Sequence, residues 1–236
     1  MPEQYLTLLQ KLLEKKINLF VLDSNKAFRE LFAKTFSSPA FNVHAAADLD
    51  EAREKTQAEP DWHCWFLDIS SQDAANLDLL KGHPDFRFAL VATSQPSMAN
   101  ARQALDAGAF EIIDKSLLAS EISVETMTLV CQVAALGHVF GGCCQKCVSL
   151  CKIMIKHQCR TAEDLGIKAK YTQRSLEIFC LKNFGLTPFQ IVNLYHTLFY
   201  LLAVPSLSLD QEYRDFCSTS LQYFVRNYHR LPSRLT

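Results

Sequence analysis

Glycine and proline are scarce in this sequence, at 7 and 8 of 236 residues. These low counts exclude collagen-like and low-complexity chains. The longest apolar runs are about eight residues, far short of the roughly 20 that a membrane-spanning helix needs, so no membrane association is expected. The first 16 residues include Glu3 and Glu14 and lack a small-residue cleavage site. Without a secretory signal, the predicted location is cytoplasmic.

The chain also lacks the usual marks of an enzyme. It has no glycine-rich phosphate loop, no nucleophile–base pair and no histidine-rich ligand set, so we expect no enzyme. Its nine cysteines are expected to remain reduced, because nothing marks the chain for secretion. Cys144 and Cys147, with Cys143 and Cys151 close by, leave three alternatives: core packing, a metal or iron–sulfur site, or redox sensing.

Charge is divided unevenly along the chain. Residues 1–140 hold 12 basic and 19 acidic side chains, whereas residues 141–236 hold 12 and 6, a net charge of +6. This division and the Gly141–Gly142 pair predict two domains, 1–140 and 141–236. A small basic domain is an electrostatic candidate for nucleic-acid binding, with an ordinary solvated surface as the alternative.

The first domain alternates short apolar runs with amphipathic segments, after a short N-terminal helix at residues 5–13. Five strands alternating with five helices indicate an α/β fold with a doubly wound, five-stranded parallel sheet, flavodoxin-like in type. The expected strands are 17–23, 41–46, 62–68, 86–93 and 110–114, and the expected helices are 26–36, 49–58, 75–82, 98–108 and 121–139.

Polar side chains follow four of these strands. They are Asp23, Asp68, Thr93 and Lys115. Right-handed crossovers bring the carboxyl ends of parallel strands to one edge of the sheet, so we expect these side chains to converge. A site of this composition can accept a phosphoryl group. One carboxylate is the acceptor and the other helps to hold Mg²⁺, while the ammonium balances the phosphate charge and the hydroxyl donates a hydrogen bond.

Four segments carry a family resemblance: FVLD at 20–23, WFLD at 65–68, VATS at 91–94 and ALDAGAFEIIDK at 104–115. Through them, residues 17–137 resemble the receiver domain of bacterial response regulators. The resemblance implies that Asp68 is the phosphoacceptor, Asp23 a metal ligand, Thr93 the switch hydroxyl and Lys115 the phosphate partner. It also implies a Mg²⁺ ion held by Asp23 and Asp68 and a sensor histidine kinase as partner.

The same region departs from the family pattern at its metal site. Ser24 stands where receivers usually carry a second acid after the first strand, and a hydroxyl is a far weaker Mg²⁺ ligand than a carboxylate. Ser116 replaces the usual proline, and Ile112 occupies the aromatic switch position. Two alternatives follow: a working phosphoacceptor, or a pseudo-receiver in which Asp68 and Lys115 form a structural pair.

The second domain is predicted to be all-helical. Thr161 with Asp164 starts a short helix, a polar turn at 168–171 follows, and a second helix runs over 172–184. This is the layout of a helix-turn-helix. The segment SLEIF at 175–179 recurs as SLQYF at 220–224, which indicates a second similar unit joined by a long helix over residues 189–204.

This arrangement resembles the AraC-type DNA-binding domain, with two helix-turn-helix units bridged by one helix. The matching segments are DLG at 164–166, TQRSL at 172–176 and FGLTP at 184–188, with a weaker match over 216–232. The DNA-contacting residues that the resemblance implies are Lys168, Lys170, Thr172, Gln173, Arg174, Glu177 and Lys182 in the first unit and Ser218, Thr219, Ser220 and Arg226 in the second. Unlike the family, the bridging helix carries no Lys or Arg.

Together these features predict a bacterial transcription regulator that binds double-stranded DNA as a homodimer. An atypical receiver domain, independent of phosphorylation, would control dimerisation. The alternative is a pseudo-receiver adaptor that has lost DNA binding and docks another protein.

Overall fold

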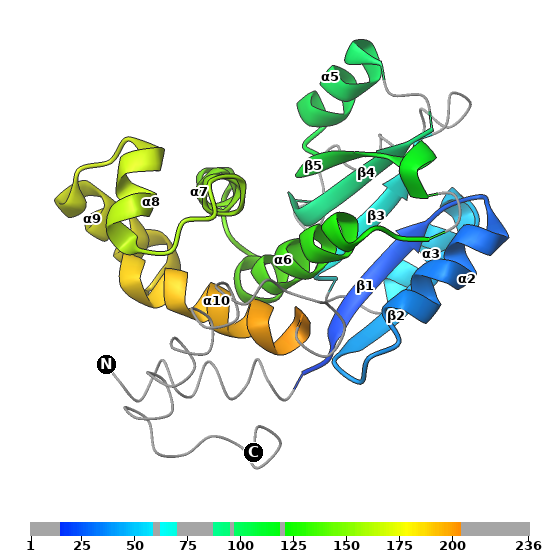
Figure 1. Cartoon of the computed structure of the whole chain (residues 1–236), viewed down its shortest axis with the longest axis horizontal. Helices are drawn as coiled ribbons and strands as arrows, with labels where there is room; N and C mark the ends of the chain where they lie inside the picture. The colour runs from blue at the N-terminus through cyan, green and yellow to red at the C-terminus, as the bar shows by residue number, and fades with distance from the viewer. Residues whose placement is uncertain (1–14, 59–61, 70–86, 95–96, 119–120, 204–236) are drawn as a thin grey trace. The chain divides into compact units, whose positions relative to one another are not determined.

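The computed structural model describes residues 15–58, 62–69, 87–94, 97–118 and 121–203 (Figure 1). They divide into two compact units. The sheet unit is Ile17–Lys152, and the helical unit contains the described residues from Ile153 onward. The division falls inside helix α7 (Gln145–Lys156), and the domain boundary at 140/141 stays a prediction.

The sheet unit contains five parallel strands in the order β2-β1-β3-β4-β5. This confirms the doubly wound sheet predicted from the sequence. The predicted helices at 5–13 and 75–82 lie outside the described residues. The elements are β1 (Ile17–Leu22), α2 (Lys26–Thr35), β2 (Phe41–Ala46), α3 (Leu49–Ala58), β3 (Cys64–Asp68), β4 (Ala89–Thr93), α5 (Met98–Asp106), β5 (Glu111–Asp114), a 3₁₀ turn η2 (Lys115–Leu118) and α6 (Val124–Phe140).

Both faces of the sheet are buried. On one face, Phe20, Trp65 and Leu67 share a core with Ala52 of α3 and Ala104 of α5. On the other face, Phe28 and Phe32 of α2 lie 5.5 and 5.2 Å from the ring of Phe66. Because both faces are covered, residues that point to either face are apolar, and β1, β3 and β4 are near-continuous apolar runs.

Helix α6 covers the second of these faces and contacts β1 and β3 (Figure 1). A Cβ on Gly137 would lie 1.7 Å from the backbone oxygen of His63, so α6 lies closer to the backbone at His63 than any side chain at position 137 would permit. Glycine is therefore required at this crossing.

Short polar side chains begin many of the helices, as expected for N-caps. The side chains of Asn25, Ser97 and Ser123 each accept a hydrogen bond from the backbone N–H three residues on. Asp48 does the same at the start of α3, accepting from Asp50 and Glu51. These caps fix where each helix begins at the edge of the sheet where the strands have their carboxyl ends.

The described part of the helical unit is entirely helical. It contains the end of α7, α8 (Ala162–Ala169), α9 (Gln173–Phe184) and α10 (Pro188–Ala203). Helix α10 contacts both α8 and α9. Within the described ranges, no helix combines the length and apolar character needed to cross a membrane.

Candidate functional site

The carboxyl edge of the sheet holds a buried cluster of two acids and one lysine. The register pairs Leu22 with Leu67, which places Asp23 and Asp68 next to each other at the ends of β1 and β3. The Nζ of Lys115 lies 2.6 Å from Asp23 Oδ2 and 2.9 Å from Asp68 Oδ2. Asp23 and Asp68 are 1% and 4% exposed. One ammonium therefore serves two buried carboxylates.

The backbone around Asp23 is also fixed by hydrogen bonds. The Asn25 N–H donates to Asp23 Oδ1 at 2.8 Å, while the Asn25 side chain caps α2. Arg29 Nη1 donates to the carbonyl oxygens of Asp23 and Ser24, at 2.6 and 3.0 Å. The guanidinium thus bridges the carbonyl oxygens of two consecutive residues. The Ser24 residue itself is exposed.

Lys115 has a third contact, with the ring of Phe28. Its Nζ lies 5.1 Å from the ring centroid, within the range of a cation–π interaction. Together with the two ion pairs, this contact holds the ammonium at the sheet edge, where the lysine side chain is 12% exposed. Thr93 lies at the end of β4 on the same edge and is 1% exposed.

The residues at this edge fit an ammonium better than a hydrated Mg²⁺ ion. Mg²⁺ favours carboxylate oxygens in octahedral geometry, and two carboxylates are present here with a serine at the third position. In the part of the chain that the structure describes, no group of three His, Cys, Asp or Glu side chains is placed to hold a metal. Lys115 already bridges the two carboxylates. The Mg²⁺ ion at Asp23 and Asp68 stays a prediction.

The structure brings together the predicted receiver-site residues Asp23, Asp68 and Lys115, and it places Thr93 at the same edge. Phosphorylation of Asp68 stays a prediction. Arg29 was not among the site residues predicted from the sequence. An arginine in the first turns of the helix after Asp23 was an available signal, but its contact depends on how that helix is oriented.

In the helical unit, α8 and α9 are joined by a three-residue turn. Lys170 ends α8 in the left-handed conformation, with φ of 59°. Thr172 then caps α9, with its side chain accepting from the Ser175 N–H. The expected Thr161 cap of α8 is present as well, accepting from the Asp164 N–H. The short helix, tight turn and second helix are those expected of a helix-turn-helix.

The predicted DNA-contacting residues of this first unit are all exposed. They are Lys168, Lys170, Thr172, Gln173, Arg174, Glu177 and Lys182. The predicted second set, Ser218, Thr219, Ser220 and Arg226, lies outside the described residues. Among the first set, Gln173 and Arg174 begin α9, where side chains of a recognition helix meet base edges.

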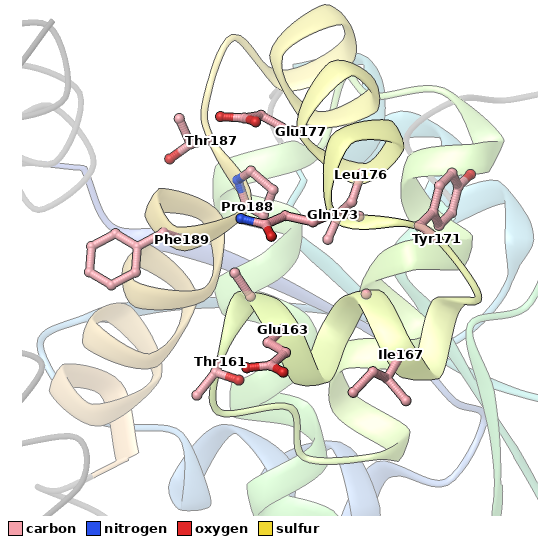
Figure 2. Close-up of a pocket in the computed structure, with 12 residues that line it drawn as sticks. Thr161, Glu163, Ile167, Tyr171, Gln173, Leu176, Glu177, Thr187, Pro188 and Phe189 are labelled. Atoms are coloured by element: carbon pink, nitrogen blue, oxygen red, sulfur yellow. The ribbon is translucent and has the colours of Figure 1, made fainter.

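A groove runs between α8, the start of α9 and the start of α10 (Figure 2). Ile167, Tyr171 and Phe189 line it and are 67%, 37% and 49% exposed. Glu163 and Glu177 also line it. Beyond the groove, Ile178 and Leu181 are exposed on α9. The surface of α9 is therefore mixed, with cationic, acidic and apolar positions.

The bridging helix α10 is mostly buried, as its apolar sequence predicts. Tyr195, His196 and Phe199 are at most 1% exposed. His196 Nε2 lies 2.9 Å from the carbonyl oxygen of Cys159. Burial lowers the pKa of His196 to about 4, so the neutral ring donates its N–H to that carbonyl at physiological pH.

Comparisons with known proteins give structural likenesses only. No protein-family model matches the chain, and no curated protein matches it. Among solved structures, a response regulator receiver protein from Pseudoalteromonas atlantica is 17% identical, with a TM-score of 0.41; the match covers 49% of this chain and 95% of that one. The receiver domain of NtrC4 from Aquifex aeolicus is 23% identical, with a TM-score of 0.39 and coverages of 52% and 99%.

A third structure covers most of the chain. It is the two-component response regulator RcsB in complex with DNA, 13% identical over 87% of this chain and 99% of that one, with a TM-score of 0.35. All three TM-scores are below 0.5 and all identities below 25%.

Proposed function

We propose that this chain is a DNA-binding transcription regulator in which the first turn of α9 enters the major groove. The observation that carries the proposal is the α8–turn–α9 geometry, which leaves Gln173 and Arg174 exposed at the start of the second helix. Arginine and glutamine can contact guanine and adenine edges with two hydrogen bonds each. The AraC type and a homodimer remain finer predictions within this proposal.

Three lysines would supply the contacts with phosphate. Lys168 and Lys170 lie at the end of α8 and Lys182 in the last turn of α9, and all are exposed. Phosphate contacts position a protein on the duplex and supply most of its salt dependence. The excess of basic residues in 141–236 also favours binding to the negatively charged phosphates.

The experiment is fluorescence anisotropy of the full chain with a mixed-sequence duplex pool, titrated from low to physiological salt. Each phosphate contact adds about 0.9 to the slope of log affinity against log salt. Changing Lys168, Lys170 and Lys182 together to alanine should therefore reduce the slope by about 3. The matched control changes three exposed cations of the sheet unit, which should leave the slope unchanged: Lys26, Arg53 and Arg102. Equal slopes in both triple variants would refute the proposal.

In the same proposal the sheet unit regulates without phosphorylation. Its support is that Lys115 already occupies both carboxylates and that Ser24 gives the cluster no third acid. Incubation with a small-molecule phosphodonor and Mg²⁺ should leave the mass of the wild type unchanged. Ser24→Asp adds the missing carboxylate and should raise Mg²⁺ affinity in calorimetry. A phosphorylated wild type would restore the sensor-kinase prediction and refute this part.

A second function is favoured by one observation. Ile178 and Leu181 are 58% and 44% exposed on the outer side of α9, where apolar side chains suit a protein partner better than DNA. In that case the chain is an adaptor whose helical unit docks another protein. No binding to duplex DNA even at low salt would favour this alternative.

A further inference from the structure

Two cysteines lie together at the N-terminus of α7. The carbonyl of Cys144 accepts hydrogen bonds from the N–H groups of Cys147 and Val148, at 2.9 and 3.2 Å, which makes Cys144 the N-cap residue. Cys147 lies three residues on and is fully buried. The two Sγ atoms are 3.4 Å apart. A disulfide needs about 2.05 Å, so the sulfur atoms need to approach by about 1.4 Å.

The two thiols differ in exposure and in charge preference. Cys144 is exposed. Hydrogen bonds from the Cys147 amide and the Cys147 thiol lower the pKa of Cys144, and the amide of Lys146 contributes in the same direction. Burial raises the pKa of Cys147, and its hydrogen bond to Cys144 raises it further. Cys144 is therefore the nucleophile of the pair, and Cys147 is the protonated partner held beside it.

We propose that Cys144 and Cys147 form a redox-active dithiol, in which a hydroperoxide oxidises Cys144 and Cys147 then closes an internal disulfide. This goes beyond the proposed regulator function and does not depend on DNA binding. An exposed thiol at a helix N-terminus, followed after two residues by a buried thiol, is an arrangement in which thiolates are reactive. The sequence left core packing, metal binding and redox chemistry as alternatives, and the exposure of Cys144 favours the last.

The chemistry balances with the hydroperoxide as the oxidant. The Cys144 thiolate attacks the terminal oxygen of the O–O bond, forming an S–O bond and releasing an alkoxide, or hydroxide when the oxidant is hydrogen peroxide. The resulting sulfenic acid is attacked at sulfur by Cys147. The S–S bond forms, the S–O bond breaks, and the Cys147 proton leaves with the departing hydroxide as water. Two thiols have lost two electrons, and the peroxide has gained them.

The surrounding cysteines do not share these properties. Burial raises the pKa of Cys143 to about 11. Its carbonyl accepts a hydrogen bond from Arg87 Nη1. The other described cysteines are all buried, namely Cys64, Cys131, Cys151, Cys159 and Cys180. Because the thiolate is the reactive form, these thiols should react slowly with peroxide.

The test is peptide mapping of the full chain after treatment with stoichiometric hydrogen peroxide and blocking of the remaining thiols. Trypsin cleaves after Lys146, so Cys144 and Cys147 fall in different peptides, 116–146 and 147–152. We expect these two peptides to be joined by a disulfide that dithiothreitol reverses, with a loss of two free thiols per molecule.

Single variants identify the sulfur atoms. The link should survive in Cys143→Ser and Cys151→Ser and disappear in Cys144→Ser, which keeps a good N-cap residue and so should fold. As a measurement on the wild type alone, iodoacetamide should alkylate Cys144 at neutral pH roughly tenfold faster than any buried cysteine. A link that persists without Cys144, oxidation elsewhere in the chain, or slow alkylation of Cys144 would overturn the proposal.

Discussion

Replacing Lys115 with methionine removes the cation that two buried acids share. Asp23 Oδ2 and Asp68 Oδ2 lie 2.6 and 2.9 Å from the same nitrogen. At an effective dielectric constant of about 20, two carboxylates at most about 5.5 Å apart repel by about 3 kcal/mol or more. Leaving a buried charge without its partner costs roughly 3–5 kcal/mol. We expect Lys115→Met to lower the free energy of unfolding of the sheet unit by that amount at neutral pH.

Urea unfolding followed by tryptophan fluorescence measures this loss. The chain has two tryptophans, Trp62 and Trp65, and both lie in the core of the sheet unit, so the signal reports on that unit. The matched control is Lys26→Met. Lys26 is 80% exposed and 3.7 Å from Glu30, so its loss should cost less than about 0.5 kcal/mol.

A further measurement separates charge from packing. Adding Asp68→Asn to Lys115→Met removes the repulsion and should recover at least half of the lost stability. If Lys115→Met costs no more than Lys26→Met, the ammonium does not stabilise the buried acids and the reasoning is wrong.

Three other predictions concern packing, backbone and titration. Gly137→Ala should destabilise the sheet unit by about 3 kcal/mol or more, because the added Cβ would lie 1.7 Å from a backbone oxygen. The control is Gly142→Ala, which should have little effect because its Cβ would meet nothing within 4 Å. Urea unfolding followed by tryptophan fluorescence compares the two variants. Lys170→Gly should stabilise the helical unit by about 1 kcal/mol by relieving a left-handed backbone, yet weaken DNA binding, which thermal melts and anisotropy check in parallel. His196 has a pKa lowered by burial from 6.5 to about 4. As the pH falls, His196 is therefore protonated in the unfolded chain before it is protonated in the folded one. The free energy of unfolding should fall by up to about 3 kcal/mol between pH 6.5 and about pH 4. Circular dichroism melts of His196→Gln should show a flatter pH dependence, and an unchanged one would exclude His196 as the cause.

The sheet could be predicted from the sequence because its strands are buried on both faces. β3 and β4 are short apolar runs that end in a polar residue, and β1 is a mostly apolar run that Asp23 follows directly, a pattern that few other structures produce. Convergence of Asp23 and Asp68 followed from the parallel topology alone. That Lys115 contacts both acids at once did not follow, because this depends on the register that places Leu22 beside Leu67.

Other features depend on where a helix begins. The alternatives predicted from the sequence, namely core packing, a metal site or redox sensing, apply to Cys144 and Cys147 equally and do not tell the two thiols apart. In the structure α7 begins at Gln145, so Cys144 caps the helix and is exposed while Cys147 is buried. The position of the helix start therefore distinguishes the exposed cysteine from the buried one. The start of α9 was predicted to within one residue: the predicted helix began at Thr172, which in the structure is the N-cap of a helix that begins at Gln173.

The most direct test of DNA reading by α9 is selection of bound sequences from a random duplex pool, done in parallel with the wild type and Arg174→Ala. An arginine that contacts a guanine edge with two hydrogen bonds contributes about 1–3 kcal/mol of discrimination at that base pair. We predict that the wild type enriches a defined sequence and that the variant loses the preference at one position within it. Enrichment of the same sequence by both proteins, or of none by either, would contradict the role assigned to α9.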